Sequence, residues 1–82
     1  MNIYVGNLDY KIKSNQLEEA FGAFGEVSAA RIITDRETRR SKGFGFVEMP
    51  NDAEGAAAVA ALDGSTLGAR PIKVTESLPK QS

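Results

Sequence analysis

Residues 42–49 read Lys-Gly-Phe-Gly-Phe-Val-Glu-Met, a pattern typical of a β-strand with two different faces. Side chains alternate between the two faces of a β-strand, so Phe44, Phe46 and Glu48 share one face of a predicted strand over 43–49. The opposite face carries Gly45, Val47 and Met49. One face is therefore aromatic and the other aliphatic, which predicts two different surroundings.

Outward from this strand, helical and strand patterns alternate along the chain. The predicted order is a strand over 1–6, a helix from an N-cap at Ser14 to a stop at Gly25, a strand over 27–34, the strand over 43–49, a helix over 52–62 and a strand over 71–76. The first helix is indicated by apolar residues at helical spacing, namely Leu17, Ala20, Phe21 and Phe24. Residues 65–70 read as a turn with room for a short extra strand.

The second predicted helix has clear boundaries. Asn51 with Glu54 three residues later resembles a capping box, and Asp63-Gly64 ends the helix. The alanines at 56–58 and 60–61 favour a helix, and their small side chains would let it approach a sheet closely.

The βαββαβ order predicts an α+β fold of the ferredoxin-like type. We expect a four-stranded antiparallel sheet with two helices on one face, and right-handed crossovers make the first and third strands central neighbours. The core-facing strand residues are Ile3, Val5, Ala30, Ile32, Val47, Met49, Ile72 and Val74. Two helices cover only one face of such a sheet, so its other face stays open to water.

Strand alternation places three aromatic residues, Tyr4, Phe44 and Phe46, on that open face, with Arg31, Ile33, Lys73, Asn2 and Glu48 on the same side. A contiguous exposed aromatic patch indicates a binding surface, whereas single exposed rings do not. Flat rings can stack on nucleic-acid bases.

Composition removes several classes of function. The 82 residues contain no cysteine and no histidine, so disulfides, thiolate catalysis and the commonest metal ligands are absent. We therefore expect no enzyme, no metal site and no cofactor. No apolar stretch approaches the length of a membrane span and the N-terminus lacks a signal-peptide pattern, which predicts a cytoplasmic protein. With a net charge of −1, a chain that binds nucleic acid has either to sort its charge by face or to draw much of its affinity from stacking.

Two motifs resemble the RNA recognition motif family. Residues 42–49 agree at seven of eight positions with its RNP1 octamer, the exception being Met49 in place of an aromatic residue. Residues 3–8, Ile-Tyr-Val-Gly-Asn-Leu, resemble the RNP2 hexamer on the first strand. The resemblance covers residues 1–77, which we expect to form one domain followed by a short polar tail at 78–82. The chain is similar to the small stand-alone bacterial members of the family.

The resemblance implies a role for each matching residue. Tyr4 and Phe46 would each stack on a base, Phe44 would lie between two sugars, and Lys42 would pair with a phosphate. The predicted loop between the second and third strands would guide or clamp the RNA strand, with Arg36, Arg39 and Arg40. Residues at the end of the last strand would read a base edge, which makes Thr75, Glu76 and Ser77 candidates.

The expected partner is single-stranded RNA, bound by a monomer acting in post-transcriptional regulation or RNA chaperoning, with single-stranded DNA as a second ligand. The alternative is a protein-interaction module of the same fold, which would show lost aromatics or exposed hydrophobic residues on the helices. Glu18, Glu19 and Glu54 predict a polar helical side instead. A ferredoxin-like enzyme is a third class, disfavoured because histidine and cysteine are absent.

Overall fold

The computed structural model describes residues 1–68 and 70–77, except for the side chain of Ser41. Its elements are β1 (Asn2–Gly6), α1 (Ser14–Gly22), β2 (Ala29–Thr34), β3 (Ser41–Glu48), α2 (Asp52–Leu62), β4 (Thr66–Leu67), β5 (Arg70–Pro71) and β6 (Lys73–Ser77). The tail predicted at 78–82 lies outside the described residues.

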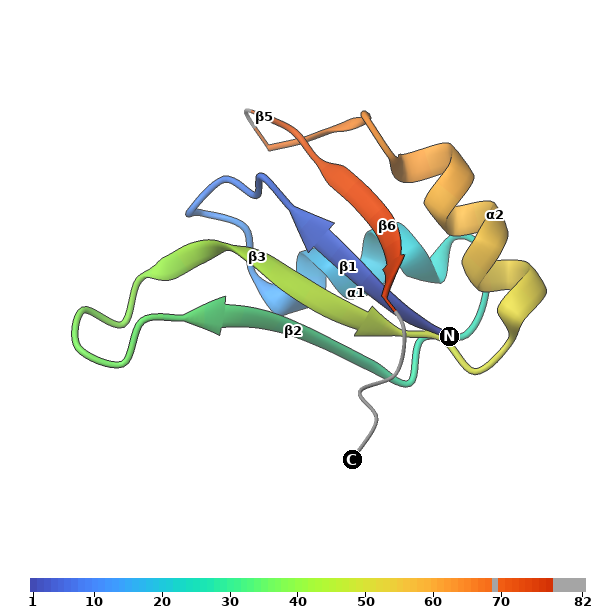
Figure 1. Ribbon diagram of the computed structural model, residues 1–82, viewed down its shortest axis with the longest axis horizontal. Coiled ribbons are helices and arrows are strands. Elements are labelled where there is room, and N and C mark those ends of the chain that lie inside the picture. The colour runs from blue at the N-terminus through green and yellow to red at the C-terminus, as the bar shows by residue number, and fades with distance from the viewer. Residues whose placement is uncertain (69, 78–82) are drawn as a thin grey trace.

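Four strands form one antiparallel sheet in the order β2-β3-β1-β6, and β4 and β5 form a separate small hairpin (Figure 1). The predicted fold is therefore confirmed, with β1 and β3 as central neighbours and the short extra strand present. In Figure 1 the sheet lies in front of α1, and the loop between β2 and β3 projects from one end of the sheet.

The core lies between the sheet and the helices. Its buried residues are Ile3, Val5, Leu8, Ile12, Leu17, Phe21, Val47, Met49, Ala58, Ile72 and Val74. Ala30 and Ile32 pack against this core but stay partly exposed, because β2 is an edge strand. Leu8 and Ile12 were not among the predicted core residues, because they come from the β1–α1 loop and follow neither strand nor helix spacing.

The boundaries of α1 differ from the prediction at both ends. Lys13, not Ser14, is the N-cap residue, and the Gln16 side-chain oxygen accepts a hydrogen bond from the Lys13 backbone N–H at 2.7 Å. The helix ends at Gly22 instead of reaching Gly25, because the Phe24 N–H donates to the Phe21 carbonyl at 3.0 Å and turns the chain. Phe24 still packs against the core from this turn.

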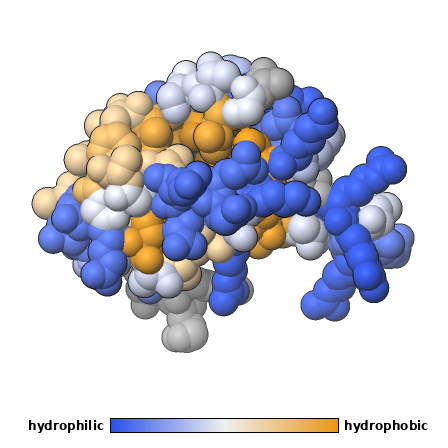
Figure 2. Space-filling model, turned by 180° about the vertical axis from the view of Figure 1, so that it is seen from behind, coloured by the Kyte–Doolittle hydropathy of each residue, from blue (hydrophilic) through white to orange (hydrophobic). Residues whose placement is uncertain are grey.

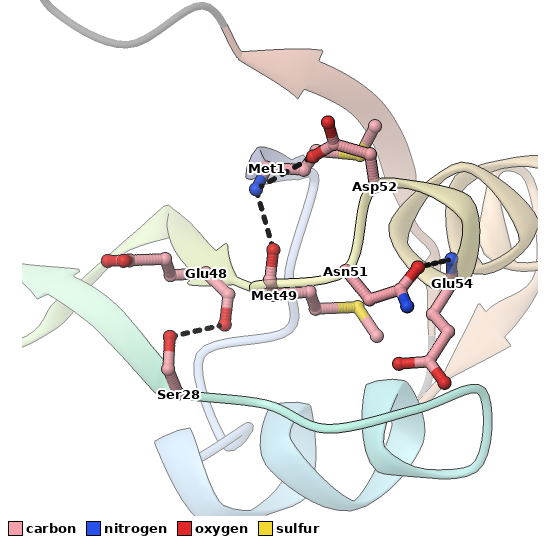
Figure 3. Close-up of polar contacts among 7 residues, drawn as sticks. All are labelled: Met1, Ser28, Glu48, Met49, Asn51, Asp52 and Glu54. Atoms are coloured by element: carbon pink, nitrogen blue, oxygen red, sulfur yellow. Dashed lines mark hydrogen bonds and ion pairs between the residues drawn. The ribbon is translucent and has the colours of Figure 1, made fainter.

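Helix α2 begins and ends as predicted, but only half of its capping box forms. The Asn51 side-chain oxygen accepts from the Glu54 N–H at 3.0 Å (Figure 3). The Glu54 carboxylate accepts instead from the backbone N–H of Glu26 at 3.3 Å, which ties α2 to the chain after α1.

The close approach of α2 occurs at one glycine and not along the alanine run. A Cβ on Gly55 would lie 2.6 Å from the Met1 sulfur, and Gly55 and Ala58 are the buried residues of the helix. The alanines at 56, 57, 60 and 61 are exposed. Figure 2 shows an apolar area that covers part of the helical side. The helical side is thus less polar than its glutamates predict.

Two kinds of feature are not found in the part of the chain that the structure describes. None of its helices is long and apolar enough to span a membrane. Within 1–68 and 70–77, no three acidic side chains gather closely enough to hold a metal ion.

Candidate nucleic-acid interface

The three aromatic side chains predicted on the open face lie together there. Tyr4 is directly opposite Phe46 in the β1–β3 register, and their ring centroids are 5.8 Å apart at 64°. The Phe44 ring lies 6.0 Å from Tyr4 and 6.3 Å from Phe46. Phe46 is 38% exposed, and the other two rings are half-buried against their neighbours. The rings form one continuous platform, called here the aromatic platform.

Two glycines set the shape of this platform. The Tyr4 ring lies along β1 over Gly6, where an added Cβ would be 2.8 Å from the tyrosine oxygen. On the opposite face, a Cβ on Gly45 would overlap the carbonyl oxygen of Arg31. Gly45 therefore lets β2 and β3 approach closely beside Phe46, and Gly6 leaves the space that the Tyr4 ring occupies.

The residues of the open face form two rows across the sheet, and both rows contain polar side chains beside the aromatic platform. The strand pairings give one row of Arg31, Phe46, Tyr4 and Thr75 and a second row of Ala29, Glu48, Asn2 and Ser77. Of the predicted base-edge residues at the end of the last strand, Thr75 and Ser77 thus share the open face. Glu76 does not, because it pairs with the buried Ile3 and by alternation points to the helical side.

The loop between β2 and β3 is an ordered turn. The Asp35 carboxylate accepts from the backbone N–H groups of Glu37 at 2.8 Å and Thr38 at 3.2 Å. These hydrogen bonds, the one from Glu37 first, hold the pKa of Asp35 below its ordinary value. Arg39 takes a positive φ of 61° and its N–H donates to the Asp35 carbonyl, which closes the turn.

The basic residues do not all meet at the aromatic platform. Arg31, Lys42 and Lys73 are exposed on strands of the sheet. Arg39 and Arg40 lie in the loop and, with Lys42, line a groove of about 990 Å³ that runs along β2 towards the start of α1. Ile33 is half-buried and borders this groove as well. The loop arginines therefore border the groove along β2.

Sequence reasoning missed one exposed aromatic residue. Tyr10 in the β1–α1 loop is 62% exposed, and the Arg70 guanidinium lies 5.5 Å from its ring centroid. Tyr10 also borders the groove along β2. Its only sequence signal is an aromatic residue between the charged Asp9 and Lys11, which spacing rules do not interpret.

The sequence of this chain matches the model of a known protein family. The sequence model of the RNA recognition motif matches residues 3–73, a range that contains the three rings of the aromatic platform and both helices. The chain belongs to the RNA recognition motif family.

Among relatives of this RNA recognition motif are cyanobacterial proteins of similar size. The RNA-binding protein named RbpA from a Nostoc strain is 46% identical over 81 residues, covering 99% of this chain and 79% of the relative. RbpA from a Synechocystis strain is 45% identical, covering 100% and 81%. The chloroplastic RNA-binding protein CP31B of Arabidopsis thaliana is 54% identical over 72 residues, but the match spans only 25% of that longer protein.

Solved RNA recognition motif structures superpose closely on this one. The crystal structure of RNA binding protein PG1 matches with a TM-score of 0.94 at 43% identity, covering 100% of this chain and 99% of that one. The structure of the Rna15 RRM with bound RNA (GU) matches with a TM-score of 0.84 at 30% identity, covering 99% and 86%.

Proposed function

We propose that this domain binds single-stranded RNA on the open face of its sheet, with Tyr4 and Phe46 each stacking on one base. The observation that carries the proposal is the aromatic platform: three rings in mutual contact on the one face that no helix covers. Relatives named as RNA-binding proteins and a neighbour solved with RNA support the same ligand.

Stacking supplies a useful share of the binding free energy. Each base stacked on an aromatic side chain contributes about 1–3 kcal/mol, so two stacks contribute about 2–6 kcal/mol. A micromolar complex corresponds to about 8 kcal/mol in total. The remainder has to come from phosphate, sugar and base-edge contacts.

The charge distribution supports a role for phosphate contacts. Lys42 lies on β3, just after the loop arginines, and Arg31 pairs directly with Phe46. Each of these two cations can therefore contact the phosphate backbone of an RNA strand that crosses the rings. Phe44, beside both stacking rings, is suited to contact the sugars. Arg39, Arg40 and Lys73 extend the positive charge along the edges, while Thr75, Asn2 and Glu48 offer hydrogen-bonding groups to bases. Ile33 adds apolar surface.

The bounds of the domain, its oligomeric state and its location in the cell are part of this proposal. We place the domain at 1–77 and expect it to act as a monomer in the cytoplasm, off membranes and without catalysis. Single-stranded DNA is a second ligand, because stacking on a ring does not use the 2′-hydroxyl group. The biological role fits post-transcriptional regulation or RNA chaperoning.

A titration tests the proposal directly. Fluorescence anisotropy with a labelled random-sequence RNA hexamer should give saturable binding by the native chain. Phe46→Ala should weaken it by about 1–3 kcal/mol while thermal unfolding stays cooperative. Glu18→Ala, on the opposite side of the molecule, is the control. Equal affinity of Phe46→Ala and the native chain would contradict the proposal.

A further inference from the structure

Beside the most exposed ring of the aromatic platform, the sheet forms a hollow of about 650 Å³. Six of the residues that line it are Asn2, Ala29, Arg31, Phe46, Glu48 and Ser77. Ala29 leaves the space, since it is the small member of the row in which Glu48 and Asn2 stand directly opposite each other. A base stacked on Phe46 would have its edge in this hollow.

The main chain of Glu48 is fixed, but its carboxylate is unengaged. The Glu48 carbonyl accepts from the Ser28 backbone N–H at 2.8 Å and hydroxyl at 3.1 Å, and the Glu48 side chain extends away from these bonds (Figure 3). Within the described residues, no hydrogen bond or ion pair joins the Glu48 carboxylate or the Asn2 side-chain amide to another group. Opposite partners in a sheet have Cβ atoms about 5 Å apart, so one base edge can span both.

A carboxylate on an RNA-binding face repels phosphates and accepts hydrogen bonds without donating any. It therefore favours base edges that present N–H donors. Guanine offers two adjacent donors, N1–H and N2–H, beside the acceptor O6, which suits a carboxylate next to an amide that can donate. Uracil offers one donor between two carbonyl oxygens, one of which would face the carboxylate.

We propose that Glu48, with Asn2 beside it, selects the base stacked on Phe46 and favours guanine over uracil. This inference rests on the proposed function and adds selectivity to it. Glu48 accepts from N1–H and N2–H of the guanine, Asn2 donates to O6, and Arg31, the β2 partner of Phe46, contacts the backbone phosphate.

Hexamers that differ at one base test this selectivity. The native chain should bind UUGUUU about tenfold tighter than UUUUUU, the size of effect that one bidentate base contact gives. In Glu48→Gln the preference should fall to about twofold, because an amide also tolerates carbonyl oxygens. Glu76→Gln is the matched control: it removes the same charge from the helical side of β6 and should keep the tenfold preference.

Replacing the guanine by inosine, which lacks the N2 amino group, provides a second measurement. The native chain should lose part of its preference, because inosine keeps N1–H and O6 and removes only the N2–H donor. Glu48→Gln should lose less on the same replacement, because its contact with N2–H is already weakened. Equal affinity of the native chain for both hexamers would overturn the selectivity, and a preference unchanged in Glu48→Gln would overturn the role of Glu48; both outcomes leave RNA binding intact. Failure to bind any hexamer would overturn the proposed function and this inference with it.

Discussion

Tyr4 and Phe46 stand opposite each other on the two central strands, with their ring centroids 5.8 Å apart in an edge-to-face contact. The contact joins the two proposed stacking residues into one surface. Aromatic pairs of this geometry stabilise each other by about 0.5–1.5 kcal/mol beyond burial. Each ring therefore helps to orient the other before any ligand arrives.

This contact predicts that the two rings are coupled in RNA binding. Tyr4→Ala and Phe46→Ala should each weaken binding of an RNA hexamer by about 1–3 kcal/mol. The double variant should lose at least about 0.5 kcal/mol less than the sum, because either truncation already misplaces the remaining ring. Tyr4→Phe keeps the ring and should bind nearly as well as the native chain. Isothermal titration of the four proteins measures the coupling, and strictly additive losses would contradict it.

Gly6→Ala should weaken RNA binding more than it affects folding. An added Cβ would lie 2.8 Å from the Tyr4 oxygen and 2.9 Å from a ring carbon, so the ring has to leave its position along β1. We expect a loss of about 1–3 kcal/mol in RNA affinity, comparable to that of Tyr4→Ala. Gly22→Ala, where an added Cβ meets nothing within 4 Å, is the matched control. The prediction fails if both glycine variants bind alike.

Gly45→Ala should instead destabilise the fold. The added methyl group would collide with the backbone carbonyl of Arg31, and a paired strand cannot move aside as a side chain can. Overpacking of this kind costs about 1–3 kcal/mol. Urea denaturation should show a lower midpoint with an unchanged slope. A midpoint equal to that of the native chain would show that β2 and β3 adjust without cost.

Salt should weaken RNA binding only modestly. Three or four phosphate contacts, at about −0.7 per contact for a single strand, give a slope of log affinity against log salt of about −2 to −3. Lys42→Ala should reduce the magnitude of the slope by about 0.7. Affinities measured from low to moderate salt give the slope, and a value near −8 would mean that electrostatics, not stacking, dominates.

Acid should loosen the loop between β2 and β3. Backbone hydrogen bonds lower the pKa of Asp35 in the folded protein, so the ionised carboxylate stabilises the turn above its unfolded-state pKa of about 3.9. That stabilisation is lost as the pH falls through the lower folded-state pKa. The protection factors of the Glu37 and Thr38 amides, the two donors, compare exchange with the intrinsic rate at the same pH and should fall in acid and in Asp35→Ala at neutral pH. Unchanged exchange in Asp35→Ala would show that the turn does not depend on this carboxylate.

Strand alternation and element order were sufficient to predict the sheet and the aromatic platform. Once Phe44 and Phe46 share a face, the period of two places Val47 on the other, and two helices cannot cover both faces. The start of α2 was equally local, since Asn51 caps a backbone N–H only three residues away. Short-range rules of this kind can be applied to the sequence alone, because the two interacting residues are close in sequence.

Tertiary structure alone decided the features that depend on distant partners. Leu8 is buried and its N–H donates to the Gly43 carbonyl, so its loop is fixed by β3 and not by its own spacing. Glu54 leaves its capping box because the Glu26 N–H, 28 residues away, offers another donor. The hollow beside Phe46 likewise needs residues from all four strands of the main sheet. Sequence periodicity reports which face a side chain takes, but only the packed chain determines which distant groups meet there.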